Sequence, residues 1–286
     1  MPTALDDRCP TPVHRTSMTQ RWDSLTFVHF EYEPSDIARL LPAPLRPDTF
    51  DGAAWVSLVP FEMQHVRLTG IPPLPGCHRF CETNVRTYVV APDGTPAVFF
   101  FSLDVPTLPV VAFARAAFGL PYQWSTMSID RRGRTIRYDC RRRRLWPRST
   151  ELAGTVAAGT MAASGMTVSI GDPVAPDDLD VFLTARWGLL TATGSAEAPR
   201  ARYTPVEHDP WPLHAATVTE LDDTLLAAAG LPEPDNRMIV RYSPGVDVRI
   251  GLPRRIAGPP ARRPASGEGR AGTPRTGEEG GATLRS

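Results

Sequence analysis

A repeat of apolar and polar residues with a period of two runs through most of the chain between residues 18 and 256. Residues 25–32, for example, read Leu-Thr-Phe-Val-His-Phe-Glu-Tyr, which is typical of a strand with one buried face. Turns at Asp93-Gly94 and Arg132-Gly133 separate neighbouring strands and predict two hairpins. In chain order, the pattern predicts strands at residues 25–32, 54–59, 86–90, 97–102, 125–140 (the second hairpin), 166–170, 217–219, 238–242 and 246–250.

Helices are predicted only where capping residues and stop signals flank a short helical pattern. They lie at residues 35–41, 109–118, 177–190 and 221–229. Many strands with turns roughly every 8–12 residues indicate an antiparallel barrel or sandwich-like sheet. Because no internal repeat and no sharp change in composition divides residues 18–256, we expect a single, mainly β domain with a few helices.

The two ends of the chain differ from this domain in composition. Residues 257–286 contain seven glycines and four prolines, and Leu284 is their single large aliphatic residue. Such a segment buries too little apolar surface to offset its ordering entropy, so we predict a disordered tail at 257–286 and a disordered extension at 1–17. Met1 and Met18 both remain candidate start residues. The chain has no apolar run of about 18 residues and no signal-peptide pattern near Met1, and we expect a cytoplasmic protein without a membrane span.

Composition narrows the possible chemistry. The formal net charge is zero, so no overall field favours nucleic acid. All 31 basic residues are arginine, and without lysine the chain cannot form an imine on a side-chain amine. Four cysteines in 286 residues give no disulfide framework. Cys77, His78 and Cys81, with His65 upstream, would be the first suspects for zinc, but a second cysteine pair is absent and we expect no metal or cofactor.

Two polar segments are candidates for a binding surface. Residues 131–148 carry nine arginines and one aspartate, the densest basic patch in the chain, yet an exposed hairpin explains the same pattern and we do not favour nucleic-acid binding. The second segment is a strand whose alternate residues share one face: Glu82, Asn84, Arg86 and Tyr88. If that face is turned inward, these residues form a site for a polar ligand. If it is turned outward, they form a solvated stripe, and the residues alone leave both interpretations open.

Six segments, in order along the chain, are similar to the YqjF-like family of unassigned function within the acetoacetate decarboxylase-like superfamily. They are residues 25–27 with 40–45, 48–61, 71–76, 82–89, 100–104 and 210–213. The resemblance implies a decarboxylase-like antiparallel barrel or cone over residues 18–256. Acetoacetate decarboxylases form a covalent imine through a lysine whose pKa a second lysine lowers.

Residues 114–123 lie over the lysine motif of those decarboxylases, in which a glycine-arginine-glutamate run precedes a glycine-phenylalanine-proline-lysine-lysine run. Arg115 matches the motif arginine, while Tyr122 and Gln123 stand where the two lysines would be. Glu82 matches the family's glutamate about forty residues upstream. The resemblance therefore implies the scaffold without its nucleophile, and acetoacetate decarboxylation is not expected.

From the resemblance and the residues together, we predict a small-molecule pocket whose candidate catalytic residues are Glu82 as acid or base and Tyr122 as hydrogen-bond donor. The candidate substrate-binding residues are Asn84, Arg86, Tyr88, Arg115 and Gln123. If the protein is an enzyme, we expect it to act as a lyase, isomerase or cyclase on an oxo- or hydroxy-acid or a polyketide-like compound. Such chemistry needs these groups and no covalent step. The alternative is a non-catalytic ligand-binding or sensor protein. The third hypothesis is nucleic-acid binding through the arginine hairpin. Whether the protein forms a homo-oligomer stays open.

Overall fold

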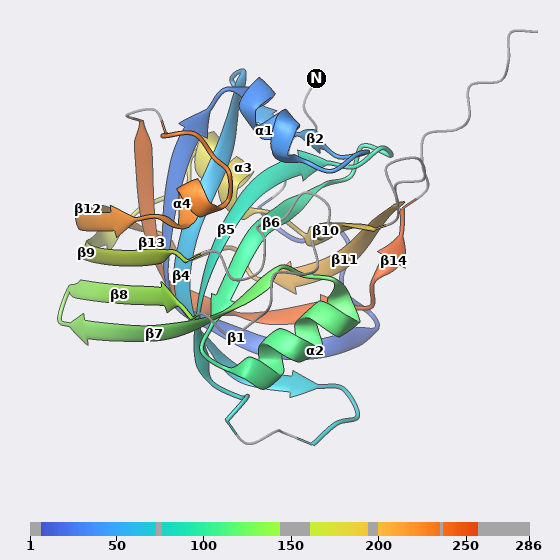
Figure 1. Cartoon of the computed structure of the whole chain (residues 1–286), viewed down its shortest axis with the longest axis horizontal. Coiled ribbons are helices and arrows are strands. Elements are labelled where there is room, and N and C mark those ends of the chain that lie inside the picture. Colours follow the sequence, from blue (N-terminus) through green and yellow to red (C-terminus); the bar gives the residue numbers. More distant parts are fainter. Residues whose placement is uncertain (1–6, 73–75, 144–160, 194–199, 235–236, 257–286) are drawn as a thin grey trace, which may run out of the picture.

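A computed structural model describes residues 7–72, 76–143, 161–193, 200–234 and 237–256 of the chain, and strands dominate it (Figure 1). The strands are β1 (Thr16–Tyr32), β2 (Arg46–Pro47), β3 (Thr49–Phe50), β4 (Ala53–Leu68), β5 (Phe80–Val90), β6 (Pro96–Val105), β7 (Tyr122–Arg132), β8 (Thr135–Arg142), β9 (Ala163–Pro173), β10 (Gly188–Thr193), β11 (Arg200–His208), β12 (His214–Asp223), β13 (Met238–Gly251) and β14 (Arg254–Arg255). The helices are α1 (Pro34–Leu40), α2 (Leu108–Phe118), α3 (Asp178–Thr184) and α4 (Leu225–Ala228).

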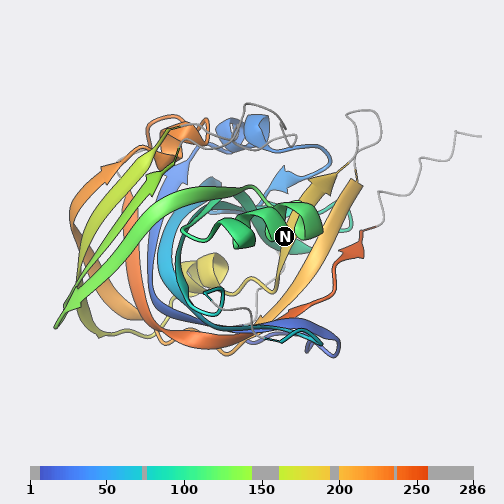
Figure 2. The same ribbon diagram turned by 60° about the horizontal axis from the view of Figure 1, so that its bottom comes forward.

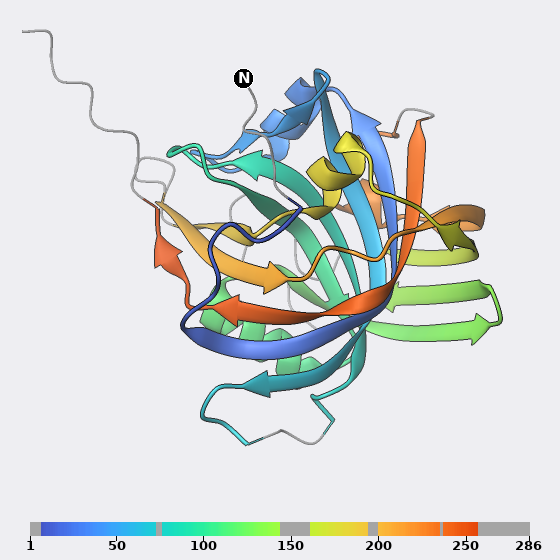
Figure 3. The same cartoon turned by 180° about the vertical axis from the view of Figure 1, so that it is seen from behind.

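These strands form one large sheet that closes on itself. Its order is β14-β11-β10-β6-β7-β8-β9-β12-β13-β1-β4-β5-β2, and the additional pairings β5–β6 and β11–β13 join strands that lie far apart in that order. The pairings are antiparallel except that β6 runs parallel to β7 and to β10. Figure 2 shows the strongly curved strands around α2 and α3, and Figure 3 shows β13, β1 and β4 side by side across the back.

Alternate residues of the long central strands pack into two different hydrophobic clusters. On β1, Phe27 belongs to one cluster and the neighbouring Val28 to the other, and both are fully buried. On β5, Tyr88 and Val89 divide in the same way. Burying a side chain of this size is worth roughly 1.5–3 kcal/mol, so both faces of these strands contribute to stability. As a consequence, every polar residue on β5 has to be accommodated inside the protein.

The predicted secondary structure is confirmed in most of the sheet and wrong for two helix ends. Both hairpins form, and the helix predicted at 109–118 is α2, with Gly119 at a positive φ of 67° as its cap. The helix predicted over 177–190 ends at Thr184, because residues 188–193 pair with β11 instead. The helix predicted over 221–229 is reduced to α4, because Leu221 lies in β12 and pairs with β9. Strand pairing overrode the local helical pattern at both places.

The ordered part of the chain begins before Met18. Strand β1 starts at Thr16, and Val13 has only 5% of its surface exposed. The backbone N–H of Val13 donates to Glu207 Oε2 at 2.6 Å, and Arg249 Nη2 donates to the Val13 carbonyl at 2.9 Å. Contacts with the sheet thus reach back at least to Val13, within the predicted extension at 1–17, and the predicted tail at 257–286 lies outside the described residues. No helix in the part of the chain described here combines the length and the apolarity that crossing a bilayer requires.

Candidate active site

The polar face of β5 is turned inward. Glu82 and Arg86 have only 3% and 8% of their surface exposed, and Asn84 and Tyr88 are buried as well. Strand β5 pairs with β4 on one side and β6 on the other, so neither edge of it reaches solvent along this stretch. Of the two orientations left open by the sequence, these side chains adopt the inward one.

A cavity of about 360 Å³ lies against this face. Most of its wall is aliphatic or aromatic, contributed by β1, β4, β6 and α2 as well as β5. Within the described residues, the only charged side chains in the wall are Glu82 and Arg86. Asn84 and Tyr122 also line it. Four of the seven predicted site residues thus share one cavity.

Tyr122 and Glu82 meet across strand β6. Tyr122 is the first residue of β7, and its hydroxyl donates to Glu82 Oε2 at 3.1 Å. Burial raises the pKa of Glu82 to about 7, although hydrogen bonds from Tyr122 and Asn84 act in the opposite direction. Burial also raises the pKa of Tyr122 well above its ordinary value, and the neighbouring Glu82 carboxylate adds to this. A carboxyl group with such a pKa can both accept and donate a proton near neutral pH.

Arg115 and Gln123 lie beside the cavity but are not among its lining residues. Arg115 Nε donates to the backbone carbonyl of Tyr122 at 2.6 Å, which holds the start of β7 against α2. Gln123 follows Tyr122 on a strand, so its side chain points to the opposite face, where it is buried next to Asp104 in the register. The predicted direct contact of these two residues with a ligand therefore has no support from their positions.

Tyr88 shares the inward face but belongs to a polar cluster beyond the cavity. Its hydroxyl lies 2.7 Å from Ser57 Oγ, which in turn lies 2.6 Å from His29 Nδ1. Burial lowers the pKa of His29 well below its ordinary value, and Arg86 and Arg241 lower it further, which favours the neutral imidazole. Sequence reasoning missed His29 and Ser57. The alternation alone could have indicated both, since they share an inward face with Phe27 and Trp55 on their own strands.

Arg86 is a buried cation without a carboxylate partner. Its Nη2 donates to the Leu183 carbonyl at 3.4 Å, and its Nε has no hydrogen-bond partner. Its guanidinium carbon lies 5.4 Å from the ring centre of Phe27 and 5.8 Å from that of Tyr88. None of the ion pairs in the described ranges includes Arg86, whereas the nearby Arg186 is paired with Asp48 at 2.6 Å. Arg86 is thus the group in this cavity whose charge is left uncompensated.

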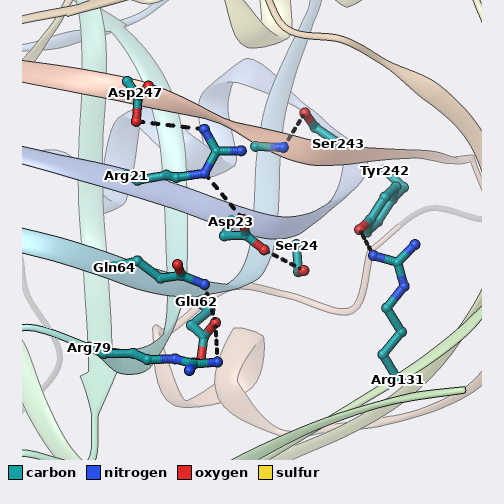
Figure 4. A network of polar contacts seen from close by, with 11 residues as sticks. Arg21, Asp23, Ser24, Glu62, Gln64, Arg79, Arg131, Tyr242, Ser243 and Asp247 are labelled. Carbon is teal, nitrogen blue, oxygen red and sulfur yellow. Dashed lines mark hydrogen bonds and ion pairs between the residues drawn. The ribbon is translucent and has the colours of Figure 1, made fainter.

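The arginine-rich hairpin of β7 and β8 projects to one side of the molecule (Figure 1), and acidic or aromatic groups engage most of its guanidiniums. Arg131 reaches across to the Tyr242 hydroxyl, 3.0 Å away, as Figure 4 shows. The ion pairs of the hairpin are Arg132 with Asp130, Arg134 with Asp172, Arg137 with both Asp139 and Glu220, and the buried pair of Arg142 with Asp104. Residues 144–148 of the predicted basic patch lie outside the described residues.

Three of the other histidines and cysteines, Cys9, His65 and His208, line a second cavity of about 650 Å³, whose lining includes neither Glu82 nor Arg86. The His208 ring packs 4.7 Å from Trp187 and 5.0 Å from Trp211, and burial lowers the pKa of His208 to about 4. In the part of the chain that the structure describes, no three His, Cys, Asp or Glu residues are grouped closely enough to hold a metal ion. Cys77 lines the cavity as a single thiol.

Comparison with known proteins places the chain in a family. The model of domain of unknown function 2071, described as an uncharacterized conserved protein, matches residues 19–247. The uncharacterized protein YqjF of Bacillus subtilis is 31% identical over 231 residues, which cover 81% of this chain and 89% of that protein.

Solved structures confirm the predicted decarboxylase-like fold. The enduracididine biosynthesis enzyme MppR in complex with pyruvate has a TM-score of 0.56 at 15% identity, over 86% of this chain and 93% of that one. An acetoacetate decarboxylase from Legionella pneumophila has a TM-score of 0.53 at 14% identity, over 87% of this chain and 92% of that one. The family match and the identity to YqjF show that this chain belongs to the DUF2071 family, on the acetoacetate decarboxylase-like fold.

Proposed function

We propose that the protein is an enzyme that transfers protons on an oxo- or hydroxy-acid, or on a polyketide-like compound, without forming a Schiff base. The observation that carries this proposal is the buried Glu82 carboxyl, 3.1 Å from the Tyr122 hydroxyl in a cavity, with its pKa raised to about 7. An isomerisation, dehydration or cyclisation needs such a group, together with a donor or cation for the developing oxyanion.

In this proposal Glu82, Asn84, Arg86 and Tyr122 have distinct roles. Glu82 removes a proton from the carbon next to a carbonyl, or returns one to it. Asn84 and Tyr122 orient that carboxyl, and the Tyr122 hydroxyl becomes available to a substrate oxygen when Glu82 is protonated. Arg86 holds a carboxylate or enolate oxygen by charge-assisted hydrogen bonds. The pyruvate complex of MppR, a protein of the same fold, supports an oxo acid as one substrate class.

Proton exchange in deuterated water tests the proposal even when the product of the reaction is unknown. A panel of oxo- and hydroxy-acids is incubated with the protein, and deuterium uptake at the carbon next to the carbonyl is followed by proton NMR. We expect at least one acid to exchange faster with the enzyme. Glu82→Gln should slow that exchange by about 10²–10⁴-fold, the usual contribution of a general acid or base.

The matched control is Glu62→Gln, which changes a carboxyl on the adjacent strand that pairs with Arg79 outside the cavity. It should leave exchange unchanged. A non-catalytic binding protein would instead bind ligands equally well in the parent and in the Glu82→Gln variant, and neither form would catalyse exchange. Borohydride should trap no adduct between the protein and a keto acid, because the chain contains no lysine.

The remaining hypotheses have less support. Nucleic-acid binding through the hairpin is disfavoured because three of its arginines, Arg132, Arg134 and Arg137, are already paired with acidic side chains. We also propose that the domain runs from about residue 13, where ordered contacts begin, rather than from Met18.

A further inference from the structure

We propose that the ligand of the cavity is a monocarboxylate with an apolar tail, bound with its carboxylate at Arg86 and its tail toward the cavity mouth beside α2. This inference rests on the proposed function for its acid–base site and names the substrate class of that site. Three features of the cavity lead to it: the order of residues along β5, the charge at one end, and the apolar wall at the other.

Strand β5 arranges the inward groups along a line. From its first residue, the inward positions are Phe80, Glu82, Asn84, Arg86 and Tyr88. Successive inward residues are about 6.6 Å apart on an extended strand, so the acid–base group and the guanidinium lie at different depths. Next to Arg86 on the same face lies Tyr88, which forms a fully buried, hydrogen-bonded cluster with Ser57 and His29. A ligand that reaches Arg86 therefore enters with its charged end first.

The charge at the inner end selects an anion. A buried guanidinium without a partner costs several kcal/mol, and an anionic ligand removes much of this cost. In the described part of the wall, the cavity has one cation, Arg86, and no second positive side chain. A carboxylate with one negative charge matches a single guanidinium in both charge and geometry. A phosphate group, which carries more charge at neutral pH, would be left undercompensated.

The opposite end of the cavity has an apolar lining that continues to the surface. Phe113 of α2 and Ile71 after β4 both line the cavity, yet 45% and 48% of their surfaces are exposed. Phe113 also packs against Phe118 in an edge-on contact, with ring centres 5.9 Å apart. A short, fully polar acid would leave this wall in contact with water. An alkyl or aryl tail that extends past Glu82 toward α2 would bury it.

A homologous series of straight-chain saturated monocarboxylates, from acetate to decanoate, tests the inference by calorimetric titration. We expect the affinity to increase about fourfold per added methylene, since burying one is worth ~0.8 kcal/mol, and then to level off when the cavity is filled. Octan-1-ol, which has the same number of carbons and no charge, should bind at least tenfold more weakly than octanoate. An affinity that stays flat or falls with chain length would overturn the apolar tail, and equal binding of octanol would overturn the carboxylate.

Two variants test the two ends separately. Phe113→Asp changes an exposed side chain, so the fold should be retained, and it should weaken decanoate binding at least tenfold while leaving acetate unchanged. Phe113→Leu is its control and should bind both acids as the parent does. Arg86→Met removes the charge but keeps an apolar stem, and it should bind octanoate no better than octanol. Equal weakening of acetate and decanoate by Phe113→Asp would place the tail elsewhere and contradict the inference.

Failure of this inference can be distinguished from failure of the proposed function. The titrations measure binding alone and do not depend on turnover. A flat series together with proton exchange that requires Glu82 would reject the tailed ligand and keep the enzyme. Dependence on chain length without any exchange would keep the ligand class and reject catalysis.

Discussion

Two buried carboxyl groups, Glu82 and Asp104, lie on opposite faces of neighbouring strands and have very different surroundings. Asp104 accepts two hydrogen bonds from Arg142, at 2.8 and 2.9 Å, and one from Ser125 at 2.7 Å. Glu82 has neutral donors only, from Tyr122 and Asn84. The residues themselves are almost equally buried, so burial is not what distinguishes the two carboxyls.

The difference lies in whether a cation shares the immediate surroundings. Asp104 and Arg142 are a matched, fully buried ion pair between β6 and β8, which is a structural feature of the packed interior. Glu82 and Arg86 line one cavity, and neither belongs to an ion pair in the described residues. An acid that is buried without a counter-ion has a raised pKa and remains available for proton transfer. The comparison therefore separates a carboxyl that is neutralised by a buried ion pair on one face from a carboxyl with a raised pKa that lines the cavity on the other.

Removing the cation from the paired face should have the largest effect. Arg142→Met leaves Asp104 buried without its ion pair, and we expect a loss of about 3–5 kcal/mol in the free energy of unfolding. Urea denaturation at pH 7 measures this. Arg79→Met is the matched control, because the Arg79–Glu62 pair is exposed and should contribute less than about 1 kcal/mol. Equal losses in the two variants would show that the Asp104 pair is not the structural anchor that we infer.

Glu82→Gln should act in the opposite direction, by an amount that depends on pH. The pKa of Glu82 in the folded protein is about 7, above the value near 4.3 expected in an unfolded chain. Between these values the unfolded chain loses the proton while the folded chain keeps it, so the parent protein loses stability as pH rises. Glutamine does not titrate. Relative to the parent, the variant should gain on the order of 3 kcal/mol between pH 4 and pH 8. A stability difference that does not change with pH would contradict the raised pKa.

Tyr122→Phe should have a smaller effect on stability and a distinct effect on titration. It removes a hydrogen bond that favours the ionised form of Glu82, so the pKa of Glu82 should rise further. The loss in stability should be about 1 kcal/mol. Carbon-13 NMR of the glutamate carboxyl carbons at increasing pH measures the first effect, with Tyr138→Phe as a control at a buried hydroxyl that contacts Thr26 instead. A Glu82 titration that is unchanged in Tyr122→Phe would mean that the 3.1 Å contact has no electrostatic consequence.

Ser125→Ala is expected to have the smallest effect. It deletes one of three hydrogen bonds to Asp104 and leaves both bonds from Arg142 in place. We expect a loss of about 0.5–1 kcal/mol, and no change in any activity assigned to Glu82. Urea denaturation and the exchange assay together measure this. Reduced proton exchange in Ser125→Ala would show that the two faces of the strands are coupled.

Much of the fold could be predicted because local chemistry and tertiary structure agree there. The Asp93-Gly94 and Arg132-Gly133 turns have a backbone preference that suits a hairpin whatever surrounds them, and Gly119 could end α2 for the same reason. The helix predicted at residues 221–229 was wrong at its start because Leu221 pairs with Met166 on β9, a residue more than fifty positions earlier in the chain. A helical pattern contains no information about such a partner.

The sequence by itself determined that Glu82, Asn84, Arg86 and Tyr88 share one face of a strand, since side chains alternate along it. It also excluded an imine on a lysine, because the chain contains no lysine. Only the tertiary structure decided that this face is buried, because α2 and residues of β1, β10, β11 and β13, from distant parts of the chain, line the cavity with it. It also separated Tyr122, which faces the cavity, from Gln123 and Arg115, which do not. The physical reason is that the pKa of Glu82 depends on its burial, on its contact with Tyr122 and on the lack of a nearby counter-ion, and no single segment contains all of these.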